Sequence, residues 1–172
     1  MLIEILLRRK IIRKLSQLYY TFFAKLKCKS YGERITANGR TWLTKNTTLS
    51  SNVNFNGFEI KGNGKVSIGS NFHSGTGCKI ITDTHNYDNG NAIPYDSSYI
   101  IRSVVIKDNV WLGDDVTILG GVSIGEGAII QAGSVVVKDI DDYVIAGGHP
   151  CRAFKTRDIE QYKNLKNNRQ FH

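Results

Sequence analysis

The sequence predicts an all-β solenoid, in which short strands stack as successive coils around a narrow core. Aliphatic residues recur at every sixth position between residues 106 and 136: Ile106, Leu112, Ile118, Ile124, Ile130 and Val136. The fifth place of each unit is small or β-branched: Val110, Val116, Val122, Ala128, Ser134 and Ile140. A helix would space its apolar residues by three and four, and an ordinary strand would alternate, so a fixed period of six indicates stacked repeats.

Two further observations favour the solenoid. Gly113 and Gly125 directly follow aliphatic positions, where a glycine relieves crowding at a corner. The same period is present upstream, in units that begin at Ile68, Ser74 and Ile80. Neighbouring coils bury each other's core, so the body grows as a linear stack. Residues 31–65 predict short strands and turns, but the positions of the six-residue units in this stretch are not fixed by the sequence.

A helix is expected at each end of the chain. Residues 2–27 carry apolar residues at steps of three and four without Gly or Pro: Leu7, Ile11, Leu15, Leu18 and Phe22. This helix packs on its own body or on a neighbouring subunit, or it lies on a membrane surface. Near the other end, Asp158 is a candidate N-cap for a short helix that closes the open end of the stack.

Composition and charge limit the classes of function. Hydrophobic residues make up 41% and charged residues 22%, as in a globular protein. Lys and Arg number 23 against 15 Asp and Glu, which gives a net charge of +8. The basic residues crowd the first thirty and the last twenty-one positions. Basic ends around a balanced middle fit an anionic cofactor, a membrane surface or an anionic carbohydrate, and we expect no nucleic-acid partner.

The chain is expected to work in the cytoplasm, with peripheral contact at the inner face of the membrane as one possibility. No apolar run reaches the roughly 18–20 residues that a membrane-spanning helix needs. The first residues do not resemble a signal peptide, because charges interrupt them. Cys28, Cys78 and Cys151 are an odd number without CxxC spacing, which favours reduced thiols and neither a disulfide framework nor a zinc site.

The expected organisation has three parts. Residues 1–30 form an N-terminal amphipathic helix, residues 31–155 a β-helix catalytic domain, and residues 156–172 a C-terminal helical cap. A loop at 86–103 interrupts the period directly after His85. A long loop inside a compact domain is more often functional than idle, although a tolerated surface insertion is the alternative.

Four segments resemble the hexapeptide-repeat acyltransferases, in the branch with maltose, galactoside and polysaccharide O-acetyltransferases and xenobiotic acetyltransferases. They are VSIGSNF, THNYD, VVIKDNVWLGDDVTILGGVSIGEGAIIQAGSVVVKDI and AGGHPCRAFKTRD, which together cover about residues 64–158 in the family's order. The resemblance implies a left-handed parallel β-helix of triangular section. It also implies acetyl-CoA as donor, no metal, and a homotrimer with active sites between adjacent subunits.

The resemblance also implies roles for individual residues. His85, at the root of the loop, is the expected general base, and imidazole suits proton transfer near neutral pH. Its other ring nitrogen needs an orienting partner, for which Asp83, Asp88 and a backbone carbonyl stay open. The expected cofactor-binding residues are Trp111, Gly113, Gly120, Ala132, Gly133, Lys138, Arg152 and Lys155. The expected acceptor-binding residues are Asn63, Asp83, Asn86, Asp88 and Tyr95, with Asn54 or Asn56 as weaker candidates.

The predicted function is transfer of acetyl from acetyl-CoA to a hydroxyl of a sugar or surface-polysaccharide unit. Within the same class, acetylation of a xenobiotic or of an amino-sugar nitrogen is the alternative. From other classes, a non-catalytic solenoid and a carbonic anhydrase of the γ type are disfavoured. The latter needs three zinc-binding histidines, and two of the four here, His149 and His172, lie in or near the tail. We expect His73 and His149 to face solvent and Cys78 to pack inward.

Overall fold

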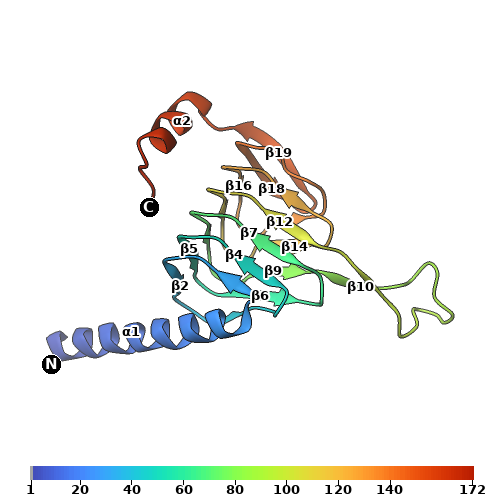
Figure 1. Ribbon diagram of the computed structural model, residues 1–172, viewed down its shortest axis with the longest axis horizontal. Coiled ribbons are helices and arrows are strands. Elements are labelled where there is room, and N and C mark those ends of the chain that lie inside the picture. The colour runs from blue at the N-terminus through green and yellow to red at the C-terminus, as the bar shows by residue number, and fades with distance from the viewer. Residues whose placement is uncertain (1) are drawn as a thin grey trace.

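The computed structural model describes residues 2–172, with the side chains of residues 2–7 outside the description. Its body is a stack of coils that cross three mainly parallel sheets, which we call A, B and C (Figure 1). Sheet A contains β1 (Ser30–Tyr31), β4 (Thr47–Leu49), β7 (Val66–Ile68), β12 (Val104–Ile106) and β15 (Ser123–Ile124). Sheet B contains β2 (Ile35–Ala37), β5 (Val53–Phe55), β8 (His73–Ser74), β13 (Trp111–Leu112), β16 (Ile129–Ile130), β18 (Val144–Gly148) and β19 (Cys151–Thr156). Sheet C contains β3 (Thr41–Trp42), β6 (Phe58–Lys61), β9 (Cys78–Ile81), β14 (Thr117–Leu119) and β17 (Val135–Val136).

The core is built by the residues that predicted the solenoid. The aliphatic residues of the period of six are at most 1% exposed, and the fifth-place residues at most 7%. Each buried aliphatic side chain contributes about 1.5–3 kcal/mol of transfer free energy, so the repeat itself supplies most of the driving force. In the lower coils the rings of Phe55, Phe58 and Phe72 fill the core, with centroids 5.0–5.9 Å apart. Cys78 packs inward, as predicted.

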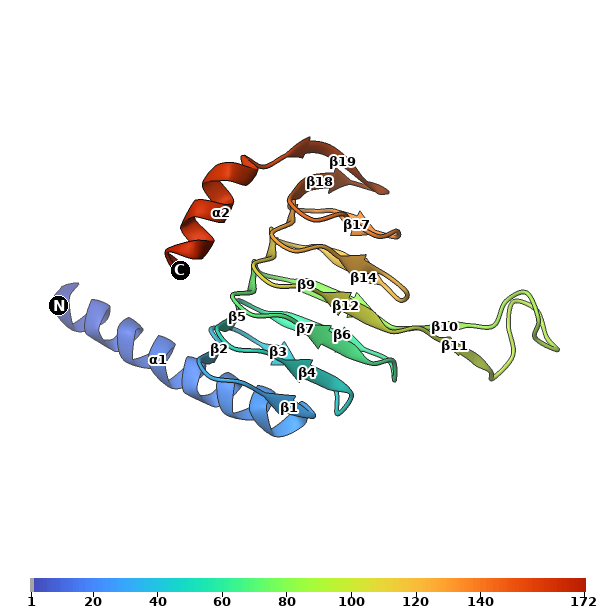
Figure 2. The same ribbon diagram turned by 45° about the horizontal axis from the view of Figure 1, so that its top comes forward.

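Helix α1 (Leu2–Lys27) has the predicted bounds and covers the N-terminal end of the stack, against β2 and β3 of the first coil (Figure 2). Ala24 is fully buried in this contact, and the Thr21 hydroxyl accepts a hydrogen bond of 2.9 Å from the backbone amide of Ala37. The helix therefore supplies a partner for an edge strand that would otherwise present unpaired backbone groups.

Helix α2 (Ile159–Asn167) begins at the predicted N-cap, because the Asp158 carboxylate accepts a hydrogen bond of 2.9 Å from the amide of Gln161. Its predicted place was wrong: it lies along the side of the stack and does not close the end (Figure 2). The buried Tyr162 contacts two coils, since its hydroxyl accepts from Asn109 Nδ2 at 2.7 Å and donates to Glu126 Oε1 at 2.9 Å. The physical reason is the antiparallel β18–β19 hairpin, which already adds an edge strand to the last coil and turns the chain back.

The interruption of the period forms a projecting hairpin at the corner between sheets C and A (Figure 1). The antiparallel strands β10 (Asp83–His85) and β11 (Tyr99–Ile101) make its stem, with His85 opposite Tyr99. The interruption predicted at 86–103 thus contains one strand of its own. Tyr99, Ile100 and Ile101 are aromatic or β-branched, the residue types that fit a strand.

Candidate active site

His85 is held on the projecting hairpin by aromatic rings. Its imidazole stacks on Tyr95, with centroids 3.6 Å apart and planes inclined by 13°, and lies 4.4 Å from the ring of Tyr99. Its Nδ1 is buried and has no hydrogen-bond partner among the described residues. Stacking therefore fixes the plane of the ring, and one nitrogen of a potential acid or base is left unengaged by the chain.

The two carboxylates proposed to orient His85 do not bond to it. Asp83 accepts hydrogen bonds from the backbone amide of Asn63 at 2.8 Å and from Asn63 Nδ2 at 3.0 Å. Asp88 is exposed in the loop. No backbone carbonyl among the described residues takes this role either, because Nδ1 of His85 has no hydrogen-bond partner there.

Asp83 and Asn63 instead clamp the root of the hairpin. The Thr82 hydroxyl lies 3.0 Å from Asp83 Oδ1 and 2.9 Å from the carbonyl oxygen of Lys61. Partial burial opposes ionisation of Asp83, but the hydrogen bonds from Asn63 and Thr82 outweigh it and lower the pKa of the carboxyl below its ordinary value. Two residues expected to bind the acceptor are thus brought together, and they fix the direction in which the hairpin leaves the body.

The loop beyond His85 is folded by its own polar groups. The backbone amide of Asn86 donates to the Ser98 carbonyl at 3.1 Å, and the Asn86 side chain accepts from the amide of Asn89 at 3.2 Å. Hydrogen bonds from Ser98 and from the amide of Asn91 lower the pKa of Asp96 to about 2. Of the residues expected to bind the acceptor, Asn86 and Tyr95 lie in this folded loop beside His85.

One expected cofactor-binding residue, Gly120, lies at the hairpin root. A Cβ atom at this position would stand 3.0 Å from the Thr82 carbonyl oxygen and 3.0 Å from the Arg102 side chain. The corner of the next coil therefore passes under the hairpin at a distance that only glycine permits without displacement.

A second group of expected cofactor-binding residues forms what we call the B–C edge, the line of corners between sheets B and C at Gly113, Ala132 and Gly133. A Cβ atom on Gly113 would lie 2.5 Å from the backbone nitrogen of Ala132, so consecutive corners touch. The amide of Gly148 donates to the Ser134 hydroxyl at 3.1 Å, which places the tip of the β18–β19 hairpin beside the edge.

The expected cations lie near the C-terminal end of the stack. Arg152 is exposed beside the tip of the β18–β19 hairpin, and Lys155 is exposed further along β19. Lys138 is exposed after β17, at the corner that follows the B–C edge along the chain. His149 faces solvent, as predicted.

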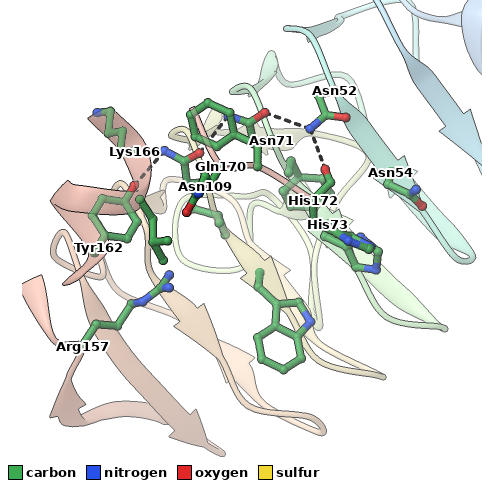
Figure 3. Close-up of a pocket in the computed structure, with 15 residues that line it drawn as sticks. Asn52, Asn54, Asn71, His73, Asn109, Arg157, Tyr162, Lys166, Gln170 and His172 are labelled. Atoms are coloured by element: carbon green, nitrogen blue, oxygen red, sulfur yellow. Dashed lines mark hydrogen bonds between the residues drawn. The ribbon is translucent and has the colours of Figure 1, made fainter. Parts of the chain in front are cut away.

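A pocket of about 580 Å³ lies over sheet B, beneath α2 and the residues that follow it (Figure 3). Trp111, the only expected cofactor-binding residue in its lining, is 52% exposed and stands beside His73 in adjacent strands. Arg157, Lys166 and His172 of the C-terminal segment complete the wall.

Sequence reasoning missed this pocket. His73 was expected to face solvent, but it is half-buried, and burial followed by the nearby His172 lowers its pKa. The floor is a ladder of side-chain amides, in which Asn52 donates to Asn71 at 2.9 Å and Asn71 to Asn109 at 2.8 Å (Figure 3). All three have positive φ of 56–61°, which asparagine tolerates at corners. A signal was available, because each of these asparagines directly precedes a buried apolar residue: Val53, Phe72 and Val110.

A single chain keeps the candidate residues in separate places. The hairpin with His85 leaves the C–A corner, whereas Gly113, Ala132 and Gly133 lie at the B–C corner, on the other side of sheet C. Trp111 lies on sheet B, in the lining of the pocket. Apart from Gly120 at the hairpin root, the expected cofactor-binding residues therefore lie away from the expected base within one chain.

Among the described residues, no group of three or more His, Cys, Asp or Glu side chains could hold a metal ion. Between residues 2 and 172, neither helix is long and apolar enough to cross a membrane.

Comparison with known proteins identifies the repeat. The family model described as bacterial transferase hexapeptide (six repeats) matches residues 103–138. A chloramphenicol acetyltransferase of Klebsiella aerogenes is 31% identical over 117 residues, which cover 59% of this chain and 56% of that protein. The chain spans about half the length, or less, of the curated relatives that it matches.

Solved structures agree with the sequence match. A maltose O-acetyltransferase of Clostridium difficile 630 is 31% identical, with a TM-score of 0.57 over 75% of this chain and 67% of that one. A galactoside acetyltransferase in complex with coenzyme A is 26% identical, with a TM-score of 0.62 over 77% of this chain and 67% of that one. The repeat, the interrupting hairpin and these similarities agree: the chain belongs to the family of hexapeptide-repeat transferases.

Proposed function

We propose that the chain is an acetyl-CoA-dependent O-acetyltransferase that acts on a sugar or a surface-polysaccharide unit, with His85 as its general base. The observation that carries the proposal is the setting of His85. Its ring is stacked on Tyr95 where the repeat breaks, and its Nδ1 is buried without a partner among the described residues. An imidazole held in this way is suited to take a proton near neutral pH.

The acetyl group is transferred directly from CoA to the acceptor. The acceptor hydroxyl oxygen bonds to the thioester carbonyl carbon while His85 takes the hydroxyl proton. The carbon–sulfur bond then breaks, and the CoA sulfur leaves as a thiolate that takes up the proton from His85. The products are the acetyl ester and CoA, and His85 returns to its neutral form.

The cysteines support transfer without an acyl-enzyme intermediate. Cys28, Cys78 and Cys151 are free thiols, and burial raises the pKa of each. For Cys78 the pKa rises to about 11, so its thiol stays protonated and unreactive at neutral pH. Free thiols also fit a reducing compartment, and we place the reaction in the cytoplasm, where acetyl-CoA is available.

The B–C edge is the proposed binding site for the donor. Its corners expose backbone at Gly113, Ala132 and Gly133, which suits an extended pantetheine arm. Arg152, Lys155 and Lys138 are exposed at the same end of the stack and would pair with the phosphates of CoA. The similar galactoside acetyltransferase was solved with coenzyme A, which supports this assignment.

We further propose that the active protein is a homotrimer with its sites between subunits. His85 and the B–C edge lie on opposite sides of sheet C, so a complete site needs the hairpin of one subunit against the edge of the next. Contacts of this head-to-tail kind close into a ring when the rotation between subunits allows it. Trp111 and its pocket would then face the neighbour's hairpin and receive the carbohydrate acceptor.

The test is acetyl-CoA turnover across a panel of sugars, nucleotide-sugars, oligosaccharides, amino sugars and chloramphenicol. Replacing His85 by alanine should lower kcat roughly 10²–10⁴-fold with little change in CoA affinity, because only the proton-transfer step is lost. Tyr87→Phe, an exposed change in the same loop, is the control. Full activity of the His85→Ala protein would exclude His85 as the base, and preference for an amine acceptor would exclude O-acetylation.

A further inference from the structure

Helix α1 presents its apolar stripe to the outside. Among the residues whose side chains are described, five apolar side chains follow one another at steps of three and four, each 56–63% exposed: Ile11, Leu15, Leu18, Phe22 and Leu26. Leu7, which the sequence placed in the same stripe, lies outside the described side chains. The N-terminal half of the helix also extends past the coils (Figure 1).

The face that packs on the solenoid is the opposite one, and it is less apolar. Besides the half-buried Ser16, Phe23 and Lys25 at its margins, it carries these half-buried or buried side chains: Gln17, Tyr20, Thr21, Ala24 and Cys28. At about 100° per residue these positions lie across the helix axis from the stripe. A surface helix of a globular protein normally buries its apolar stripe, so here the stripe is left for a partner outside the chain.

Charge decides which partner fits. The helix and the residue pair after it carry eight basic residues: Arg8, Arg9, Lys10, Arg13, Lys14, Lys25, Lys27 and Lys29. No acidic residue lies between Glu4 and Glu33. By helical position, Lys14 and Lys25 border one side of the stripe and Arg8 borders the other.

Two copies that paired through this stripe would bring like charges together, which costs free energy. An anionic bilayer satisfies both features at once. The apolar side chains enter the boundary between headgroups and acyl chains, and the flanking cations meet lipid phosphates, each with about 1 kcal/mol of attraction near the surface.

We propose that α1 docks the protein on anionic lipid membranes, lying in the plane of the interface with its apolar stripe inserted. The solenoid then stands on the membrane by its N-terminal end, because α1 covers that end of the stack (Figure 2). The inference does not depend on the proposed acyl transfer.

The experiment is co-sedimentation of the full chain with vesicles of phosphatidylcholine alone and of phosphatidylcholine with 30% phosphatidylglycerol. We expect at least a tenfold greater bound fraction on the anionic vesicles, and a loss of binding when salt is raised from about 0.1 to 0.5 M. The variant Leu15→Gln/Leu18→Gln/Phe22→Gln should bind at least tenfold less, because the inserted side chains are gone while helix propensity is nearly kept.

Matched controls separate the stripe from charge in general. Arg8→Gln/Lys14→Gln removes two cations that border the stripe and should weaken binding, whereas Lys163→Gln/Arg169→Gln removes two cations near the C-terminus and should not. Equal binding to both kinds of vesicle, or unchanged binding of the triple variant, would overturn the proposal. So would a change in oligomeric state of the triple variant, measured by sedimentation velocity, together with no vesicle binding by the parent protein. Turnover of a soluble acceptor by the triple variant reports on the catalytic proposal separately.

Discussion

At the scale of the residue, the hairpin orients His85 by contact and not by hydrogen bonding. Tyr95 stacks on the ring at a centroid distance of 3.6 Å, while the nearest carboxylate in sequence, Asp83, accepts a hydrogen bond from Asn63. The ring is thus held by its faces, while its buried Nδ1 has no hydrogen-bond partner among the described residues. If His85 acts as the proposed base, Tyr95 is a positioning residue, because it holds the ring by stacking.

The first prediction concerns Tyr95. Tyr95→Ala should lower kcat about tenfold or more, because the unsupported imidazole samples unproductive orientations. Tyr95→Phe keeps the stacked ring and should stay within about twofold of the parent. Steady-state kinetics with saturating acetyl-CoA measures both. A loss as large in Tyr95→Phe as in Tyr95→Ala would show that the hydroxyl matters and the stacking does not.

The second prediction concerns the clamp at the hairpin root. Hydrogen bonds from Asn63 and Thr82 lower the pKa of Asp83 below its ordinary value of 3.8. The folded state thus favours the ionised carboxylate. The stabilisation is present above pH 3.8 and is lost as pH falls through the lowered value in the folded state. Asp83→Asn should destabilise the protein at pH 7 and reduce the difference in unfolding free energy between pH 7 and pH 3. Urea unfolding of both proteins at the two pH values checks this, and an unchanged pH dependence would contradict it.

At the scale of the element, the period was predictable where corners have constant length. From Ile106 to Val136 an aliphatic residue that is at most 1% exposed recurs at every sixth position. Upstream the spacing of buried residues varies: Phe55 follows Leu49 by six positions, Ile60 follows Phe55 by five, and Ile68 follows Ile60 by eight. The coils there stack in the same way, but their corners differ in length, so the period of six cannot be recognised in the sequence.

The helices show a second limit on what the sequence predicts. Spacing predicted α1 and the N-cap predicted α2, since both are local properties of the chain. The place where each helix packs depends on contacts distant in sequence. Thr21 meets Ala37 and Tyr162 meets Asn109, so neither docking face followed from helical period alone.

The third prediction tests how α2 is attached. Tyr162→Phe removes the hydroxyl that joins Asn109 to Glu126 and leaves their polar groups without that partner. We expect a loss of about 1–3 kcal/mol in the free energy of opening α2 from the body. Amide hydrogen exchange in residues 159–167 is the direct measurement. Tyr87→Phe, at an exposed site, is the control and should leave exchange unchanged. Equal exchange in the two variants would exclude the hydrogen bonds of the Tyr162 hydroxyl as the attachment of α2.

At the scale of the whole molecule, the three corners of the solenoid carry different candidate functions. The C–A corner projects the hairpin with His85, the B–C corner exposes backbone at Gly113 and Ala132, and the A–B corner carries the asparagine ladder beneath α2. The sequence predicted the first two because a broken period and family motifs mark them. It did not predict the third, because three asparagines spaced along the chain become one surface only when the coils stack.

The fourth prediction follows from this separation. If the site lies between subunits, two inactive variants should restore activity when they assemble together. His85→Ala lacks the base but keeps the B–C edge. Ala132→Trp places a bulky side chain at an exposed position of that edge but keeps the base. In a randomly mixed ring, a base-competent subunit meets an edge-competent neighbour at roughly a quarter of the interfaces, so co-expressed variants should recover about that fraction of parental activity.

The measurement is turnover by complexes purified through different tags on the two variants. If the mixtures are no more active than either variant alone, the base and the donor act within the same subunit. That result would contradict an intersubunit site, because sheet C separates the two within one chain.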